Sequence, residues 1–271
     1  MNKNIIGIFL ARKPQLGGAH QYTLSMIRAL ESLSQKHFNT IVYYQEREWE
    51  SFIPASFQKS FQKRPLINRV FSWFYKNIDK SQNGYRRFPV LCNPIIGIIN
   101  KSECELIIFP DQDLECYQIK KKSLVTVHDL MHRYEPYFAE YSINFIDERD
   151  KHYFNICKHV TGVLVDSEIG KKQIIESYNR KDDTVYVLKF VPPYYLLDYK
   201  VVDVKSKYAL PEEYFFYPAQ YWQHKNHENL IRAVKILKDN GILINLVLVG
   251  ARKNYFTAIT KLIEKIGSAT C

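Results

Sequence analysis

The sequence predicts an α/β fold in which parallel strands are covered by helices on both faces. Short apolar runs alternate with helical patterns along the chain, and these runs are apolar on both faces, as the strands of a buried parallel sheet are. Pro192, Pro193 and Pro211 interrupt a stretch without clear periodicity, which separates two such series. We therefore predict a complete N-terminal Rossmann-like domain over residues 1–204 and a partial second Rossmann-like domain over residues 205–271.

In the first domain, apolar runs predict strands at 4–10, 40–45, 105–109, 123–127, 161–165 and 184–188. A Gly-Gly loop follows the first strand and precedes a helix whose inward face is predicted to carry Tyr22, Met26, Ala29, Leu30 and Leu33. Ser167 is the predicted N-cap of a helix over 168–178.

The second domain is predicted to contain two strands, at 214–218 and 244–250, each followed by a helix. The first helix, over 227–239, has Leu230, Ile231, Val234 and Leu237 on one face. The second helix has Phe256, Ile259, Leu262, Ile263 and Ile266 inward and ends at Gly267. Two such strands need neighbours on both sides, so we expect this domain to be truncated.

Composition limits the classes of partner and the compartment. Lys and Arg number 38 against 28 Asp and Glu, a formal charge of +10, which favours a phosphorylated ligand, a nucleic acid or an acidic membrane surface. No nucleic-acid-binding motif is present, so we expect no nucleic acid. The five cysteines form no CxxC pair and no export signal precedes them, which predicts reduced thiols in a cytoplasmic protein without a metal site.

Ligands of open parallel sheets bind beyond the carboxyl ends of the strands, and several residues fall there. Gly17 and Gly18 follow the first strand, where free amides at a helix start can bind a phosphate, although an ordinary turn is an equal alternative. His128 ends the fourth strand, where an imidazole can hydrogen-bond a sugar hydroxyl or a phosphate; the alternative is a structural histidine.

In the second domain, Lys225 precedes a helix with Asn226 as predicted N-cap and Glu228 in the first turn. An ammonium beside helix amides is suited to a diphosphate, whereas a solvated lysine is the common alternative. Asp111 and Asp113, after the third strand, are weak candidates for an acceptor cleft, because paired aspartates in a loop usually form turns.

Residues 57–76 mix basic and aromatic side chains without an acid. Such a segment suits peripheral contact with an anionic membrane at the inner face of the cell, or equally the covering of a core.

Several segments together resemble one family. They are GIFLARKPQLGGAHQYTLSMIRAL, VTVHDLMHRYEPYF, VLVDSEIGKKQIIESY and YPAQYWQHKNHENLIRAVKIL followed by LVLVG. Their order and spacing are similar to those of retaining glycosyltransferases with the GT-B fold, the large group 1 family. The resemblance spans nearly the whole chain.

The resemblance implies roles for four of the predicted site residues. Gly17 and Gly18 would lie against the donor phosphates or the transferred sugar, and His128 would contact that sugar and support catalysis. Lys225 would bind the donor pyrophosphate, whereas the arginine of many members is replaced here by Gln220, which supplies no charge. The family's paired glutamates, seven residues apart, have no match after Gly250.

The activity implied is transfer of a sugar from a nucleoside-diphosphate sugar to a glycan or lipid-linked acceptor in cell-surface polysaccharide synthesis. No metal or other cofactor is expected to be obligatory, and the two domains would close over the donor. We expect this chain alone to be weakly active or inactive. The alternative is a non-catalytic module that binds a glycan, a membrane or a subunit and is completed by a partner chain. A dinucleotide-dependent oxidoreductase is disfavoured because no GxGxxG motif follows the first strand.

Overall fold

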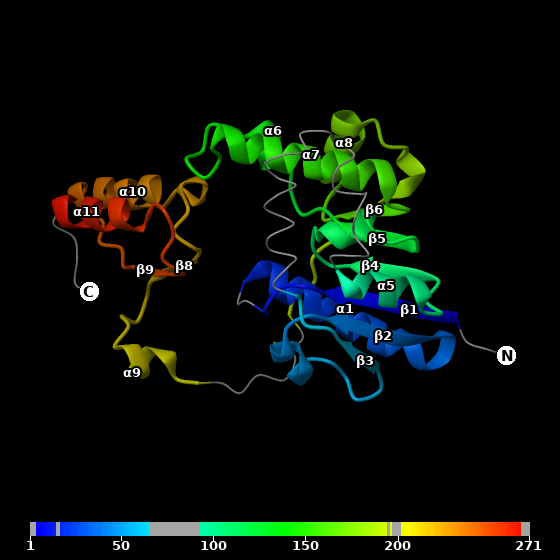
Figure 1. Ribbon diagram of the computed structural model, residues 1–271. Helices are drawn as coiled ribbons and strands as arrows, with labels where there is room; N and C mark the ends of the chain where they lie inside the picture. Colours follow the sequence, from blue (N-terminus) through cyan, green and yellow to red (C-terminus); the bar gives the residue numbers. More distant parts are fainter. Residues whose placement is uncertain (1–3, 15–16, 66–92, 194–195, 197–201, 267–271) are drawn as a thin grey trace. The chain divides into compact units, whose positions relative to one another are not determined.

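The computed structural model describes residues 4–14, 17–65, 93–193, 196 and 202–266. The chain divides into two compact units, labelled by element in Figure 1. The first unit comprises residues 1–134 and 147–198, and the second comprises 135–146 and 199–271. The predicted domain boundary between residues 204 and 205 stays a prediction.

The first unit contains a parallel sheet of seven strands among the described residues, in the order β3-β2-β1-β4-β5-β6-β7. The strands are β1 (Asn4–Leu10), β2 (Phe38–Tyr44), β3 (Gln58–Phe61), β4 (Leu106–Phe109), β5 (Lys122–Thr126), β6 (Gly162–Val165) and β7 (Val185–Val187). The predicted parallel sheet is thus confirmed. It gains one strand, β3, that the apolar runs did not indicate.

Helices cover both faces of this sheet (Figure 1). They are α1 (Gly18–His37), α5 (Pro94–Lys101), α6 (Met131–Tyr134), α7 (Ile143–His159) and α8 (Glu168–Tyr178), with short 3₁₀ turns at Arg47–Ser51, Leu114–Tyr117 and Asp182–Thr184. Successive strand residues point to opposite faces, so Ile8 packs with α1 whereas Phe9 packs with α5, α7 and α8. The Ser167 hydroxyl accepts a hydrogen bond from the Gly170 amide at 3.1 Å, which confirms the predicted cap of α8.

The inward face of α1 differs in part from the prediction. Tyr22, Met26 and Leu30 are buried as predicted, and Ile27 joins them, whereas Ala29 is exposed and Leu33 is 51% exposed. A helix of 20 residues is about 30 Å long. The strand β1 of seven residues spans only about 23 Å. Because α1 is longer than β1, its last turns extend past the end of the strand, and Leu33 in these turns stays exposed.

The second unit contains β8 (Phe215–Pro218) and β9 (Leu246–Val249), which pair in parallel, and α9 (Val204–Tyr208), α10 (His227–Asp239) and α11 (Phe256–Ile266). Ile231 and Ile259 are buried with Tyr221, and the predicted inward residues of α10 and α11 lie on the half-buried faces of their helices. Phe215 and Phe216 of β8 stay 64% and 55% exposed. The predicted helix end at Gly267 lies outside the described residues.

No helix in the described part of the chain is long and apolar enough to cross a membrane. Cys104, Cys116 and Cys157 are free thiols buried in the first unit.

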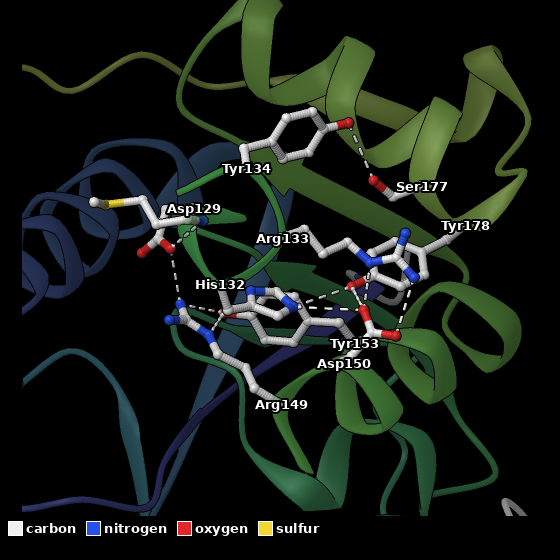
Figure 2. Close-up of polar contacts among 10 residues, drawn as sticks. Asp129, His132, Arg133, Tyr134, Arg149, Asp150, Tyr153, Ser177 and Tyr178 are labelled. Carbon is white, nitrogen blue, oxygen red and sulfur yellow. Dashed lines mark hydrogen bonds and ion pairs between the residues drawn. The ribbon is translucent and has the colours of Figure 1, made fainter. Parts of the chain in front are cut away.

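A partly buried polar network joins α6, α7 and α8 (Figure 2). Arg133 donates two hydrogen bonds to the Asp150 carboxylate, one of them at 3.0 Å, and the Tyr178 hydroxyl donates a third at 2.9 Å. The His132 ring is fully buried beside them, with Nε2 3.5 Å from Asp150 Oδ1 and with no hydrogen-bond partner for Nδ1 among the described residues. Burial, with Arg149 nearby, lowers the pKa of His132 to about 4, although Asp150 and Asp129 act in the opposite direction.

This low pKa predicts an acid-sensitive fold. Between pH 6.5 and 4 the unfolded chain binds a proton at His132 that the folded chain excludes, so stability present above pH 6.5 is lost as pH falls toward 4. We expect His132→Gln to remove on the order of 2 kcal/mol of this pH dependence. Urea unfolding of both proteins at a series of pH values measures the difference; parallel curves for the two proteins would contradict it.

Candidate functional site

The strand order of the first unit reverses between β1 and β4. From β1 the chain builds the sheet toward β2 and β3 on one side, and then toward β4, β5, β6 and β7 on the other. At such a switch point the loops that leave the carboxyl ends of two neighbouring strands diverge, and ligands bind in the opening. The loops after β1 and β4 therefore define the candidate site of this unit.

Arg12, two residues after β1, reaches the loop after β4. Its Nη1 atom lies 3.4 Å from Asp111 Oδ2, and its Nε atom lies 3.9 Å from Asp113 Oδ1. Trp49 Nε1 donates to the Arg12 carbonyl at 2.6 Å, which fixes the backbone of the loop. Asp111 and Asp113 thus lie at the predicted edge of the sheet. Arg12 was not predicted; its signal in the sequence is a basic residue two positions after a strand.

The two aspartates differ in environment. Asp113 is buried, and burial together with Asp111 and Glu115 holds the pKa of its carboxyl well above the usual range, although Arg12 and Arg64 oppose this shift. The Asp113 carbonyl also accepts from the Cys116 amide at 3.1 Å, so Asp113 serves the turn as well.

His128 follows β5 at the same edge. Its ring meets Tyr22 of α1 edge-on, with 5.1 Å between centroids, and stacks on Phe190 at 6.2 Å. The Nε2 atom is buried and has no hydrogen-bond partner among the described residues. Burial lowers the pKa of His128, whereas Asp111, Asp129, Asp166 and the Pro110 carbonyl act to raise it. At neutral pH the site therefore presents an uncharged imidazole with one nitrogen left for a ligand.

Gly17 and Gly18 form the start of α1. Gly17 has a φ of 137°, which favours glycine, and its carbonyl accepts from the Gln21 amide at 3.1 Å. A Cβ atom on Gly18 would meet nothing within 4 Å, so the space beside this residue is open. Tyr22, one turn further, donates to or accepts from the Thr126 hydroxyl at 3.2 Å and contacts the His128 ring. The first turns of α1 and His128 are therefore brought together.

In the second unit, Lys225 ends the 3₁₀ turn Gln223–Lys225 and is exposed. The Tyr217 hydroxyl donates to its carbonyl at 2.7 Å, and the Gln220 side chain accepts from Trp222 Nε1 at 2.9 Å. Lys225 lies near enough to His227, the first residue of α10, to lower the pKa of that buried ring, an effect smaller than that of burial itself.

Asn226 does not act as the predicted side-chain cap of α10. It occupies the N-cap position, but with a φ of 56° and no side-chain hydrogen bond to the helix. The preceding 3₁₀ turn closes with the Asn226 amide donating to the Gln223 carbonyl at 2.9 Å, and Asn226 adopts a left-handed conformation, which Asn tolerates better than most residues. The Asn226 side chain therefore leaves the first-turn amides of α10 uncapped, as an anion-binding helix start requires.

Residues 135–146 belong to the second unit, and two of them form hydrogen bonds with the 3₁₀ turn Gln223–Lys225. The Ala139 amide donates to Gln223 Oε1 at 2.8 Å, and His224 Nδ1 lies 3.0 Å from Glu140 Oε1. Burial raises the pKa of Glu140, but its own backbone amide and His224 outweigh burial and lower it overall. These long-range contacts had no signal in the sequence.

The predicted site residues thus fall into two groups. Gly17, Gly18, His128, Asp111 and Asp113 lie at the carboxyl edge of the first sheet, and Gln220 and Lys225 lie before α10 in the second unit. Of the segment 57–76, Phe57 is buried and β3 pairs with β2, so this part belongs to the core and sheet. Residues 66–76, the helical part of the prediction, lie outside the described residues.

No family profile and no curated protein sequence matches the chain. Solved structures do. Anabaena HepE in complex with UDP and glucose superposes with a TM-score of 0.61 at 11% identity, over 98% of this chain and 67% of HepE. A glycosyltransferase from Rickettsia africae gives 0.57 at 15% identity, over 99% and 66%. The lipopolysaccharide outer core galactosyltransferase WaaB gives 0.50 at 12% identity, over 98% and 65%.

The chain spans about two thirds of the length of these structures. At such low identity the likeness concerns the fold. The parallel sheet and the second α/β unit observed here match the fold of these glycosyltransferase structures. The predicted GT-B-like α/β fold is therefore confirmed.

Proposed function

We propose that this protein is a retaining glycosyltransferase of the group 1 type. It would transfer a sugar from a nucleoside-diphosphate sugar to a glycan or lipid-linked acceptor in cell-surface polysaccharide synthesis. The observation that carries the proposal is the buried Nε2 atom of His128, which has no hydrogen-bond partner among the described residues and lies at the carboxyl edge of the sheet in a fold shared with glycosyltransferases. A buried polar atom without a partner is costly in a folded protein and suits a ligand that supplies the missing hydrogen bond.

In this proposal His128 contacts a hydroxyl of the transferred sugar. Gly18 leaves open space beside the first amides of α1, which suits a phosphate or a sugar oxygen. The Arg12–Asp111 pair lies at the same edge and offers both donors and acceptors to the hydroxyls of an acceptor. No residue of this set calls for a metal ion, because the developing charge on the leaving diphosphate can be met by ammonium and amide groups.

Lys225 takes the role of diphosphate anchor in the second unit. The uncapped amides of α10 stand next to it, and the two features together form an anion site of the kind common at helix starts. Gln220 contributes no charge, and its side-chain oxygen is already bonded to Trp222. We therefore assign most of the diphosphate affinity of this chain to Lys225 and the helix amides.

Replacing Lys225 by alanine is expected to weaken binding of a nucleoside diphosphate at least tenfold, because one fixed charge-assisted contact contributes roughly 1.5–3 kcal/mol. Isothermal titration with UDP, GDP, ADP and their glucose conjugates measures the change. Lys238→Ala, in the last turn of the same helix, is the matched control and should bind as the wild type does. If the wild-type protein binds none of these donors saturably, the proposed function is contradicted and only the similarity of fold remains.

One observation favours a second candidate function. Phe215 and Phe216 of β8 are exposed, and so is Val249 of β9, an apolar surface that suits another polypeptide. A non-catalytic module completed by a partner chain would present such a surface, and it would bind a glycan, an anionic membrane or a subunit. Sedimentation velocity over a range of concentrations separates the two: a strictly monomeric protein that binds a nucleotide sugar favours the enzyme.

A further inference from the structure

Asp129, the residue after His128, is held by a guanidinium group from α7. Its Oδ1 atom accepts from Arg149 Nη2 at 3.0 Å and from the Met131 amide at 3.0 Å. Figure 2 shows Arg149 between Asp129 and Tyr153. Arg149 donates to the Tyr153 hydroxyl from Nε at 3.1 Å and from Nη2 at 2.8 Å, and its guanidinium carbon lies 5.1 Å from the ring centroid.

Tyr153 fixes this chain of contacts to the core. Its ring is 1% exposed and packs in the larger hydrophobic cluster of the first unit. Arg149 is itself mostly covered, with 18% of its side chain exposed. A planar guanidinium that bridges a phenol and a carboxylate holds both in one geometry, which a lysine ammonium does not reproduce. Asp129 is therefore anchored, through Arg149, to a buried aromatic ring.

The anchored residue is next to His128 in the chain. His128 and Asp129 lie in the short connection between β5 and α6, where the hydrogen bond from the Met131 amide closes a tight turn on the Asp129 side chain. A rotation of the Asp129 backbone would turn the His128 side chain away from Tyr22 and Phe190, its two ring neighbours. The direction of the imidazole thus depends on what holds Asp129.

We propose that Arg149 is a positioning residue for His128: by holding Asp129 it keeps the imidazole at the angle that leaves Nε2 directed to a ligand. The inference rests on the proposed function for the role of that ligand. The positioning itself is a property of the free protein and can be measured without a donor or an acceptor.

The charges around His128 make the role of Arg149 measurable through the pKa of the His128 ring. Asp111, Asp129 and Asp166 face the ring from the loops after β4, β5 and β6, and each acts to raise its pKa against the larger effect of burial. Arg12 pairs with Asp111, and Arg149 pairs with Asp129. Removing Arg149 leaves the Asp129 charge unbalanced beside the ring, so the pKa of His128 should rise.

The test is Arg149→Met, followed by proton–nitrogen NMR titration of the His128 ring in the unliganded protein. We expect its pKa to rise by about half a unit and the nuclear Overhauser contacts between the His128 and Tyr22 rings to weaken. In an Asp129→Asn background the same Arg149 substitution should produce no shift of the His128 pKa. The double-mutant cycle therefore assigns the effect to the pair.

Arg133→Met is the matched control. Arg133 belongs to the same network and binds Asp150 and Tyr178, but its described contacts do not include Asp129 or His128. It should lower the melting temperature without moving the His128 resonances. If Arg149→Met leaves the His128 pKa and its Tyr22 contacts unchanged, as Arg133→Met does, the proposal is overturned.

Arg149→Lys keeps a charge near Asp129 but cannot hold Asp129 and Tyr153 together. Should the methionine variant fail to fold, this substitution is expected to weaken the His128–Tyr22 contacts while leaving the His128 pKa nearly unchanged. Unaltered contacts would overturn the proposal here too. If the His128 resonances respond as expected and the wild-type protein binds no nucleotide sugar, the positioning stands and the proposed function fails.

Discussion

His128→Phe is expected to lower the rate of sugar transfer at least a hundredfold while changing the stability of the fold little, because the lost hydrogen bond to the Pro110 carbonyl is offset by removal of an unpartnered buried nitrogen. Phenylalanine keeps the ring that packs on Tyr22 and Phe190. It removes the buried Nε2 atom, which has no partner among the described residues and therefore costs stability in the unliganded protein. Loss of a single hydrogen-bonding group that meets the transition state costs about 10²–10³-fold in rate.

Rate and stability measured together distinguish a binding role from a structural one, and His152 offers the matched control. Its ring is bonded at both nitrogens, with Nε2 2.9 Å from the Gln112 carbonyl and Nδ1 3.1 Å from the Tyr117 hydroxyl. His152→Phe should lower the free energy of unfolding by about 1–3 kcal/mol, because both partners lose a buried hydrogen bond. Transfer assays with the donor found by titration, and urea unfolding of each variant, measure both effects. A fully active His128→Phe protein would assign His128 to structure alone.

The central strands and most helix faces could be predicted because burial on both sides leaves a simple record in the sequence. The run Asn4–Leu10, for example, is apolar from its second residue onward, and a parallel sheet covered by helices requires that pattern. The strand β3 was missed because it carries the polar sequence QKSF and pairs with β2 alone at the end of the strand order. A strand at an edge needs less apolar surface, so periodicity does not reveal it.

The candidate site was predicted only where its position follows from a strand end. His128 comes two residues after β5 and the glycines lie between β1 and the start of α1, so the rule for parallel sheets finds them. Arg12 and Glu140 were missed, because their partners Asp111 and His224 are distant in the sequence and only folding brings them together. Asn226 was predicted correctly in position but not in conformation, since the 3₁₀ turn that sets its backbone has no local pattern of its own.

Gly250→Ala is expected to destabilise the second unit by on the order of 3 kcal/mol. A Cβ atom at this position would lie 2.0 Å from the Ala219 carbonyl oxygen and 3.0 Å from the Gln220 Cα atom. Both are backbone atoms, so no side-chain rotation can relieve the overlap. The Tyr221 amide donates to the Ala251 carbonyl at 3.1 Å beside them, which joins the segment after β9 to the segment after β8.

Gly241→Ala separates the effect of this overlap from that of ordinary backbone strain. Gly241 has a φ of 80°, but a Cβ atom there would meet nothing within 4 Å, so its substitution should cost only about 1 kcal/mol. Hydrogen exchange of the α10 and α11 amides reports on the second unit by itself, whereas a single melting curve would mix two units. Because Gly250 approaches the backbone that carries Gln220, its substitution should also weaken nucleotide binding where Gly241→Ala does not. Equal protection in the two variants would mean that the backbone contact at Ala219 does not hold this part of the unit together.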